Sequence, residues 1–298
     1  MNNQFIDFKQ KRELGDILSD TFAFLRTQFK PFFTTFFKIV GPYLAVFLIS
    51  YGFYFSSFSS IIDFNASTDY GVNPLDVFSS VAFIIAAIVL LFSGIATYVL
   101  SQATTLYYIQ SYTGNNGNIN DSEIRKNVYK NFWSFIGLGI LVILSVGVAF
   151  LFCCIPGIFL YVPLSLSFAI MVYSKRSATD SFGYSFDLVK DYWWMTFATI
   201  FVVGLIVTFA SYAFSIPAVI YQYFKMGIFS GELDSETMGV NFVDPIYIVL
   251  NLVSTLAQFL LNIISLVAVT FIYFNLNEIK NNEGTMERIQ KLGGDLDS

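Results

Sequence analysis

The side chains with the most potential for chemistry in this chain are uncharged amides and hydroxyls that recur at helical spacing within long apolar segments. The longer stripe, near the C-terminus, consists of Asn251, Thr255, Gln258, Asn262 and Ser265. A second stripe includes Ser93 and Thr97. Such side chains either hydrogen-bond to neighbouring helices or line a polar groove that holds a ligand. The stripes fit both interpretations, and the second interpretation places the groove between the second and sixth apolar segments.

Other kinds of catalytic chemistry find little support among the residues. The chain has no histidine, which excludes any reaction that needs an imidazole base or ligand. Its two cysteines, Cys153 and Cys154, are adjacent and have no base beside them, so they predict neither a zinc site nor a nucleophile. The glycines of Thr113–Asn118 lack the Lys-Ser/Thr that follows a phosphate-binding loop. We therefore expect no catalytic activity, no cofactor and no metal.

The elements that carry the polar stripes are long apolar helices. Of the 298 residues, 55% are hydrophobic and only 12% are charged, whereas a soluble domain has roughly a quarter charged residues. A membrane-spanning helix needs about 20 mostly apolar residues, and the segments that qualify are 32–55, 77–109, 132–152, 158–173, 193–223 and 245–275. Their apolar runs are continuous, not alternating, which excludes a transmembrane barrel. The sequence therefore predicts an all-α bundle of six spans in a single integral membrane domain, residues 1–298.

The third and fourth segments are interpreted as a helical hairpin. Residues 132–173 are too many for one crossing, and Pro156 and Pro163 interrupt the run. We therefore expect a tight turn at residues 153–157 and a bend near Pro163.

Basic residues are distributed very unevenly among the connections between the six segments. Fifteen of the 16 lysines and arginines lie in the N-terminal region, the second and fourth connections and the C-terminal tail, and Lys225 is the exception. Because cytoplasmic loops carry an excess of Lys and Arg, both termini should face the cytoplasm (N-in/C-in). This predicts a multi-pass protein of the cytoplasmic (inner) cell membrane. The net charge of −5 argues against nucleic acid as a partner.

Three amphipathic segments precede spans and should form helices at the cytoplasmic membrane surface. The first covers residues 13–30 and should end at Pro31, which can then begin the next helix. The second begins at Asn120, with Glu123 three residues later, and the third begins at Ser177, as is typical of helix N-caps. The apolar stripe of the third comprises Ala178, Phe182, Phe186, Val189 and Trp193. Such helices either anchor the spans or sense lipids and dock a partner.

A cytoplasmic aromatic motif leads into the fifth span. Its characteristic residues are Ser185, Phe186, Leu188, Lys190, Trp193 and Trp194. Together with Arg12–Leu18 and Phe24–Lys30, this run resembles the membrane domain family associated with bacterial glycerophosphodiester phosphodiesterases, as a stand-alone relative without the hydrolase domain. The resemblance implies a six-helix protein of the bacterial cytoplasmic membrane. The family's hydrolase domain relies on histidines and metal-binding acids, so its activity does not carry over to a chain without histidine.

The polar tail, residues 277–298, contains one further helical pattern. Met286, Ile289 and Leu292 share one side of a short segment before Gly293. Because two helical turns rarely persist alone, this segment should be either solvated or docked on the cytoplasmic face.

Two functions from different classes fit these features. The first is a non-catalytic integral membrane protein that acts in envelope organisation, lipid handling or partner docking. Its partners would be membrane lipids and another membrane or cytoplasmic protein. The second is a small permease that uses the polar stripe between spans two and six. A water-filled cavity at this stripe would favour the permease, whereas a dry, closely packed seam would favour the first function.

Overall fold

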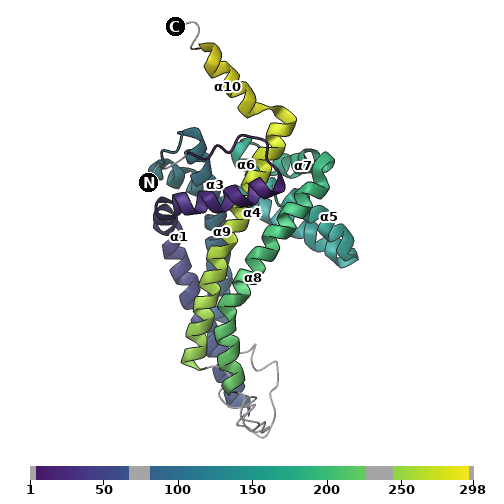
Figure 1. The fold of residues 1–298 in the computed structure, drawn as a ribbon. Coiled ribbons are helices and arrows are strands. Elements are labelled where there is room, and N and C mark those ends of the chain that lie inside the picture. The colour runs from purple at the N-terminus through teal and green to yellow at the C-terminus, as the bar shows by residue number, and fades with distance from the viewer. Residues whose placement is uncertain (1–4, 67–80, 226–243, 295–298) are drawn as a thin grey trace. The chain divides into compact units, whose positions relative to one another are not determined.

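The computed structural model describes residues 5–66, 81–225 and 244–294, and their regular structure is entirely helical (Figure 1). Six helical stretches are long and apolar enough to cross a membrane: Leu14–Ser57, Phe83–Gly114, Asp121–Phe152, Cys154–Tyr173, Ala178–Lys225 and Pro245–Asn281. The predicted all-α bundle with six spans is therefore confirmed, and the chain is a multi-pass helical membrane protein. Residues 77–80 of the second predicted span lie outside the described residues. The N-in/C-in orientation stays a prediction.

The chain divides into two compact units that share several helices along the sequence. The first unit comprises Met1–Ile39, Val99–Ile206 and Ile263–Ser298, and the second comprises Val40–Tyr98 and Val207–Asn262. The helices α1 (Leu14–Ala66), α3 (Val81–Gly114), α8 (Trp193–Lys225) and α9 (Pro245–Asn281) each contribute to both units. The single membrane domain that the sequence predicts stays a prediction.

The second unit is built from close helix contacts and a few polar bonds. A Cβ added to Gly94 of α3 would lie 3.3 Å from the Phe47 ring of α1, so glycine permits this approach. The Ser254 hydroxyl of α9 donates to the Phe214 carbonyl of α8 over 2.7 Å. Small residues and hydroxyls are the usual means of helix association in a membrane.

An ion pair joins the ends of α8 and α9 in the second unit. The Lys225 ammonium lies 2.7 Å from the Asp244 carboxylate, which also accepts a hydrogen bond from the Tyr221 hydroxyl. Burial by itself raises the pKa of Asp244. The hydrogen bonds from Lys225 and Tyr221 outweigh this effect and lower the pKa to about 2. Because the folded-state pKa is depressed, the stabilisation from this carboxylate is present at neutral pH and is lost as the pH falls towards 2.

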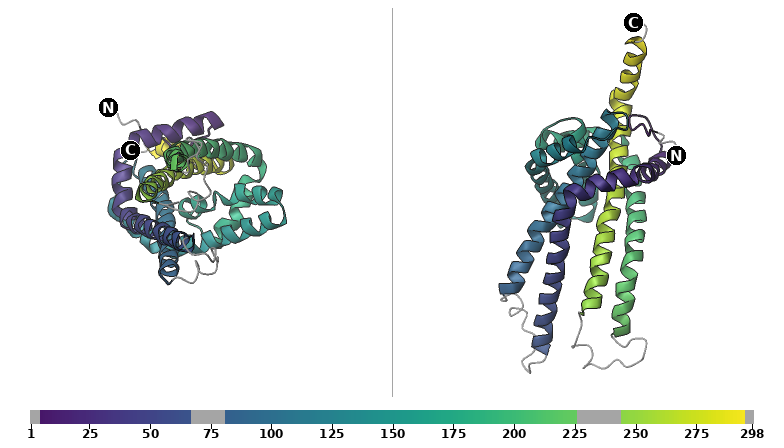
Figure 2. Two further views of the ribbon diagram at one scale, coloured as in Figure 1. Left: turned by 90° about the horizontal axis from the view of Figure 1, so that it is seen from below. Right: turned by 90° about the vertical axis from the view of Figure 1, so that its left-hand side faces the viewer.

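Helix α1 continues through Pro31, which corrects the prediction that the interfacial helix ends there. Proline cannot donate to the Thr27 carbonyl, and its ring crowds that turn. The helix nevertheless runs on past this position, and the purple helix in the right-hand view of Figure 2 is bent along its length. The interfacial segment and the first span are thus one bent helix.

The second and third interfacial helices differ from each other. Asn120 caps α4 (Asp121–Phe152) by accepting from the Glu123 amide over 3.2 Å, as predicted, but α4 then runs without a break into the third span. The third is a separate helix, α7 (Ala178–Val189), capped as predicted by Ser177 and joined to α8 by the 3₁₀ turn η1 (Lys190–Tyr192).

The predicted hairpin between the third and fourth spans is confirmed. Helix α4 ends at Phe152, Cys153 adopts an extended backbone, and α5 (Cys154–Leu164) begins at once. Residues 165 and 166 then separate α5 from α6 (Ser167–Tyr173), so the bend falls just after Pro163. A proline inside a helix removes a hydrogen bond and kinks the helix near that position.

Gly157 permits the close approach of the two hairpin helices. A Cβ at Gly157 would lie 2.6 Å from carbons of the Phe150 ring, whereas a Cβ at Gly147 would meet nothing within 4 Å. We expect Gly157→Ala to destabilise the solubilised protein by about 1–3 kcal/mol through overpacking. Gly147→Ala should stabilise it by about 0.5–1 kcal/mol through its helix propensity. Thermal unfolding in detergent measures both, and equal melting temperatures for the two variants would contradict the packing of the hairpin.

The N-terminal arm, which we define as residues 5–12, lies on an aromatic core of the first unit. Phe8 is fully buried and stacks on Phe271 of α9, with ring centroids 4.1 Å apart. The arm also meets α10 (Glu283–Gly294), where Lys9 pairs with Glu287 and Arg288 donates to the Lys9 carbonyl. The helix predicted in the tail is therefore confirmed; it contacts the arm through these polar pairs, and its apolar residues Met286 and Ile289 are exposed.

The prediction that the polar tail begins at Asn277 is wrong. Asn277 and Glu278 belong to α9, which runs to Asn281, and both are buried. The Glu278 carboxylate accepts from the Gly284 and Thr285 amides and caps the first turn of α10. A charged residue at the end of an apolar run predicts exposure, but here it satisfies the free amides of the next helix.

Candidate functional site

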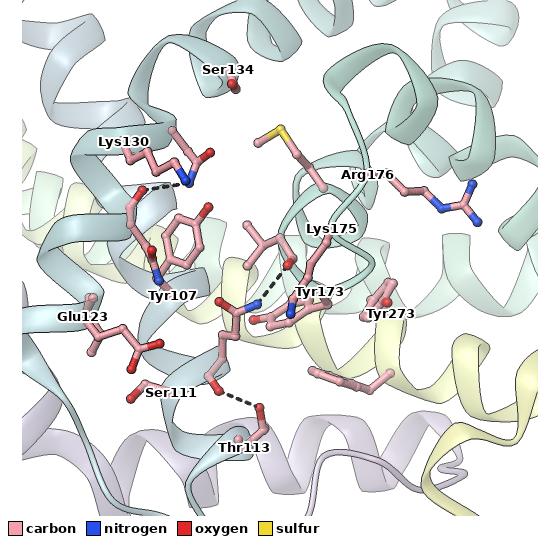
Figure 3. A pocket seen from close by; sticks show the side chains of 18 of the residues that line it. Tyr107, Ser111, Thr113, Glu123, Lys130, Ser134, Tyr173, Lys175, Arg176 and Tyr273 are labelled. Atoms are coloured by element: carbon pink, nitrogen blue, oxygen red, sulfur yellow. Dashed lines mark hydrogen bonds between the residues drawn. The ribbon is translucent and has the colours of Figure 1, made fainter. Parts of the chain in front are cut away.

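A cavity of about 730 Å³ lies within the first unit (Figure 3). Its walls come from the N-terminal arm, the C-terminal half of α3, the first half of α4, the end of α6 with the turn to α7, the C-terminal half of α9 and the start of α10. Among the lining residues are Lys9, Tyr107, Gln110, Ser111, Glu123, Asn127, Lys130, Asn131, Ser134, Tyr173, Lys175, Arg176, Tyr273 and Glu283. We call this cavity the basic pocket, because four lysine and arginine side chains line it against two glutamates.

One wall of the basic pocket is a polar face of α4. Glu123, Asn127, Lys130, Asn131 and Ser134 line the pocket at spacings of three, four or seven residues, which places them on one side of a helix. The neighbouring face of α4 is anchored by the buried Ile124, Val128 and Phe135, of which Ile124 also lines the pocket. The alternation of these two faces fixes which side chains meet the cavity. The Asn120 cap fixes where this part of the helix begins.

Tyrosines on α6 and α9 fix the turn that closes the pocket. The Tyr173 hydroxyl donates to the Leu106 carbonyl of α3 over 3.1 Å. The Tyr273 hydroxyl lies 2.9 Å from the Ser174 hydroxyl, and the two tyrosine rings stack with centroids 5.3 Å apart. The Gln110 amide adds a bond of 3.0 Å to the Val172 carbonyl. The chain on the N-terminal side of Lys175 is thus tied to two other helices.

Lys175 has an unusual backbone. Its φ of 52° lies in the left-handed region, which a residue with a side chain rarely adopts unless it is asparagine or aspartate. The other non-glycine residues with positive φ in the described ranges are Asn116 and Asn282, which fit that preference. Lysine at such a position costs roughly 1 kcal/mol or more of backbone strain. In Figure 3 the Lys175 side chain reaches into the centre of the pocket above Tyr173.

The charges of the pocket are only partly compensated. Lys9 is paired with Glu287 on α10, and the Arg176 guanidinium lies 3.9 Å from the centroid of the Tyr184 ring. Glu283 accepts a hydrogen bond of 2.8 Å from the Asn277 amide.

The side chains of Glu123, Lys130 and Lys175 make no hydrogen bond or ion pair with any described residue. Two unpaired cations and one unpaired carboxylate therefore face the same cavity. Such an arrangement is able to attract the negatively charged part of a polar ligand to the lysines.

The polar stripe predicted in the last span lies in the second unit and makes local bonds. The Asn251 amide donates to the Tyr247 carbonyl of its own helix over 2.9 Å, and the Gln258 amide donates to the Ser215 hydroxyl of α8 over 3.1 Å. Thr255 is half-buried, and Asn262 is exposed. The Gln258 bond thus reaches the fifth span, and a hydrogen bond between Thr255 and Tyr51 of α1 reaches the first.

No hydrogen bond of the described residues joins Ser93 or Thr97, the two residues predicted in the second span, to that stripe. The Ser93 hydroxyl donates to the Leu90 carbonyl of its own helix over 3.2 Å. Thr97 is buried, and its hydroxyl has no hydrogen-bond partner among the described residues. The polar groove between the second and sixth spans stays a prediction.

The structure places the aromatic motif on α7, η1 and the start of α8. Ser185 and Leu188 are buried, Phe186 is half-buried, and Lys190 is exposed. The Trp193 indole donates to the Phe159 carbonyl over 3.3 Å, while Trp194 is 76% exposed. The buried face of α7 includes Ser181 and Ser185, and the predicted stripe residues Phe182 and Phe186 lie at its edge. Small serines pack deepest because they allow α7 to approach its neighbours closely.

The basic pocket was not predicted from the sequence, although one signal for it exists. The polar face of α4 has the same periodicity as the stripe in the last span, but it lies in a segment rich in charged residues, where polar side chains are expected. Lys175 and Arg176 belong to a connection whose basic residues are explained by the orientation of the spans. The sequence therefore gives no separate reason to assign them to a binding site. Within the described ranges, no group of three or more acids or cysteines could hold a metal ion.

Comparisons of the chain with protein-family models, with curated proteins and with solved structures find no match. The resemblance to the membrane domain family therefore stays a prediction.

Proposed function

We propose that this chain is a non-catalytic membrane protein that handles lipids by binding a phosphate-bearing headgroup in the basic pocket. The observation that carries the proposal is the unpaired ammonium of Lys175. This residue lines the pocket, and its own backbone lies in the left-handed region. Glycine or asparagine would adopt this backbone with less strain. The strained backbone and the free ammonium together support a role for the charge of this exposed lysine.

The surroundings of the pocket support a lipid as the ligand. Aromatic side chains with one polar edge gather at the level of the headgroups in membrane proteins. Trp193 and Trp194 begin α8 just after η1, and Tyr107, Tyr173 and Tyr273 line the pocket itself. Lysines beside such aromatics attract the anionic surface of the cytoplasmic leaflet.

The wider setting of the proposal is the cytoplasmic membrane of a bacterium, with both termini inside. The concentration of 15 of the 16 basic residues in alternate connections supports this orientation. The resemblance of Asp180–Trp194 to the membrane domain family supports the bacterial setting.

Replacement of Lys175 by asparagine tests the proposal. We expect Lys175→Asn to weaken the binding of both phospholipids about tenfold or more, the effect of losing one charge-assisted hydrogen bond. The melting temperature of the solubilised protein should stay the same or rise, because asparagine tolerates a positive φ. Native mass spectrometry with added dioleoyl-phosphatidylglycerol and dioleoyl-phosphatidylethanolamine measures the binding, and a thermal scan in the same detergent measures the stability.

Lys126→Asn is the matched control, because Lys126 is an exposed lysine of α4 that does not line the pocket. This variant removes the same charge and should bind lipid like the wild type. If Lys175→Asn and Lys126→Asn change binding equally, the charge of the whole surface binds lipid, and the pocket is not the site.

A further inference from the structure

We infer that the ligand of the basic pocket is a zwitterion, with an amine as well as a phosphate, of which a phosphoethanolamine headgroup is the simplest example. The inference rests on the proposed function and adds a role for Glu123. Lys130 and Lys175 would bind the phosphate, and the Glu123 carboxylate would accept hydrogen bonds from the ammonium group.

The arrangement of charge on α4 separates the two ends of the ligand. Glu123 and Lys130 are seven residues apart, which is about 10 Å along a helix axis. Figure 3 shows Glu123 and Lys130 at opposite ends of one wall, with Lys175 reaching in from the facing turn. An extended head with a positive and a negative end fits between side chains placed in this way.

The unpaired state of Glu123 distinguishes a zwitterion from a purely anionic ligand. The second acid of the pocket, Glu283, is already bonded to Asn277. Glu123 has no hydrogen-bond or ion-pair partner for its carboxylate among the described residues, and it is exposed to whatever fills the cavity. An anionic head without an amine would bring its charge near this carboxylate, which is unfavourable. An ammonium group would instead form a charge-assisted hydrogen bond with Glu123.

The neighbouring amides fit the middle of such a ligand. Asn127 lines the wall between Glu123 and Lys130, and Asn131, just past Lys130, donates its amide to the Asn127 carbonyl over 3.0 Å. The neutral amide of Asn127 can donate to an ester oxygen of a phosphate at this position without adding charge.

The test compares two lipids that differ in the amine. Full-length protein in detergent is titrated with dioleoyl-phosphatidylethanolamine and with dioleoyl-phosphatidylglycerol, and native mass spectrometry gives both dissociation constants. We expect the wild type to prefer the ethanolamine lipid by roughly tenfold, as one charge-assisted hydrogen bond would give. Glu123→Gln should abolish this preference, whereas Glu13→Gln, which alters an exposed acid outside the pocket, should retain it.

The outcomes separate this inference from the proposed function. Equal or tighter binding of the glycerol lipid by the wild type overturns the zwitterion and leaves the pocket as a phosphate site. Loss of both lipids in Lys175→Asn with an unchanged ratio in Glu123→Gln also overturns the role of Glu123. If neither lipid binds the wild type, the proposed function itself fails.

A further arm distinguishes the source of the headgroup. Soluble O-phosphoethanolamine is added as a competitor of the ethanolamine lipid. Competition at a concentration similar to that of the lipid would support a free zwitterionic metabolite as the ligand. Weak competition, at a concentration much higher than that of the lipid, supports the membrane lipid.

Discussion

Arg12→Ala is expected to lower the free energy of unfolding of the solubilised protein by about 3 kcal/mol, the lower end of the cost of breaking a buried ion pair. The Arg12 side chain is only 1% exposed, and its guanidinium donates to Asp20 over 2.8 Å and to the carbonyls of Asp7 and Phe8. It also lies 4.7 Å from the centroid of the Phe271 ring. Loss of this group removes the Arg12 donor from the carboxylate and from the Asp7 carbonyl, while the Phe8 carbonyl keeps the hydrogen bond from the Gln10 amide.

The lower end of the range applies because Asp20 is 30% exposed and can recover water. Arg12→Lys is the informative partner variant, since it keeps the charge but cannot bond Asp20 and the two carbonyls with one planar fork. We expect it to lose most of the same stability. Denaturant titration of the protein in detergent measures both variants, and an Arg12→Ala protein as stable as the wild type would contradict the contacts of the N-terminal arm.

Gly284→Ala should release the N-terminal arm from α10. A Cβ at Gly284 would lie 2.7 Å from the Lys9 Cβ and closer still to the Lys9 carbonyl oxygen. The obstacle is the backbone of the arm, so no side-chain rotation relieves the overlap. We expect a loss of stability of about 1–3 kcal/mol and faster amide hydrogen exchange in residues 5–12, where the Ile6 amide now bonds the Tyr112 hydroxyl.

Gly183→Ala in α7 provides the comparison for this glycine. A Cβ at Gly183 would meet no atom within 4 Å, so alanine should be neutral or stabilise α7 by up to about 1 kcal/mol. Hydrogen exchange followed by mass spectrometry compares the two variants residue range by residue range. Unchanged protection of the arm in Gly284→Ala would show that α10 does not hold it.

The parts of the fold that depend on local sequence were predictable. Asn120 and Ser177 cap their helices because a side-chain oxygen reaches an amide only three residues away. The hairpin at Cys153 follows from the length of the apolar run and its prolines. At Pro31 the sequence predicted a helix end, whereas α1 continues. Proline removes one hydrogen bond whether the helix ends or continues, so the residue alone does not distinguish the two. Only the packing of the following turns decides whether the helix continues.

The candidate site depends on contacts that no local pattern records. Lys175 lines the same cavity as the polar face of α4, and the turn that carries it is held in part by Tyr273, almost 100 residues away, through Ser174. The buried Glu278 has the same origin, since its partners belong to the next helix. Charge and periodicity predict which side chains are exposed to water or lipid. They do not predict which exposed charges share a cavity.

The most direct test of the headgroup site is an experimental structure of the chain in nanodiscs that contain phosphatidylethanolamine. The proposed function predicts phosphate density within hydrogen-bonding distance of the Lys175 ammonium, inside the cavity lined by Glu123 and Lys130. An ordered lipid elsewhere, with only water at Lys175, would contradict it.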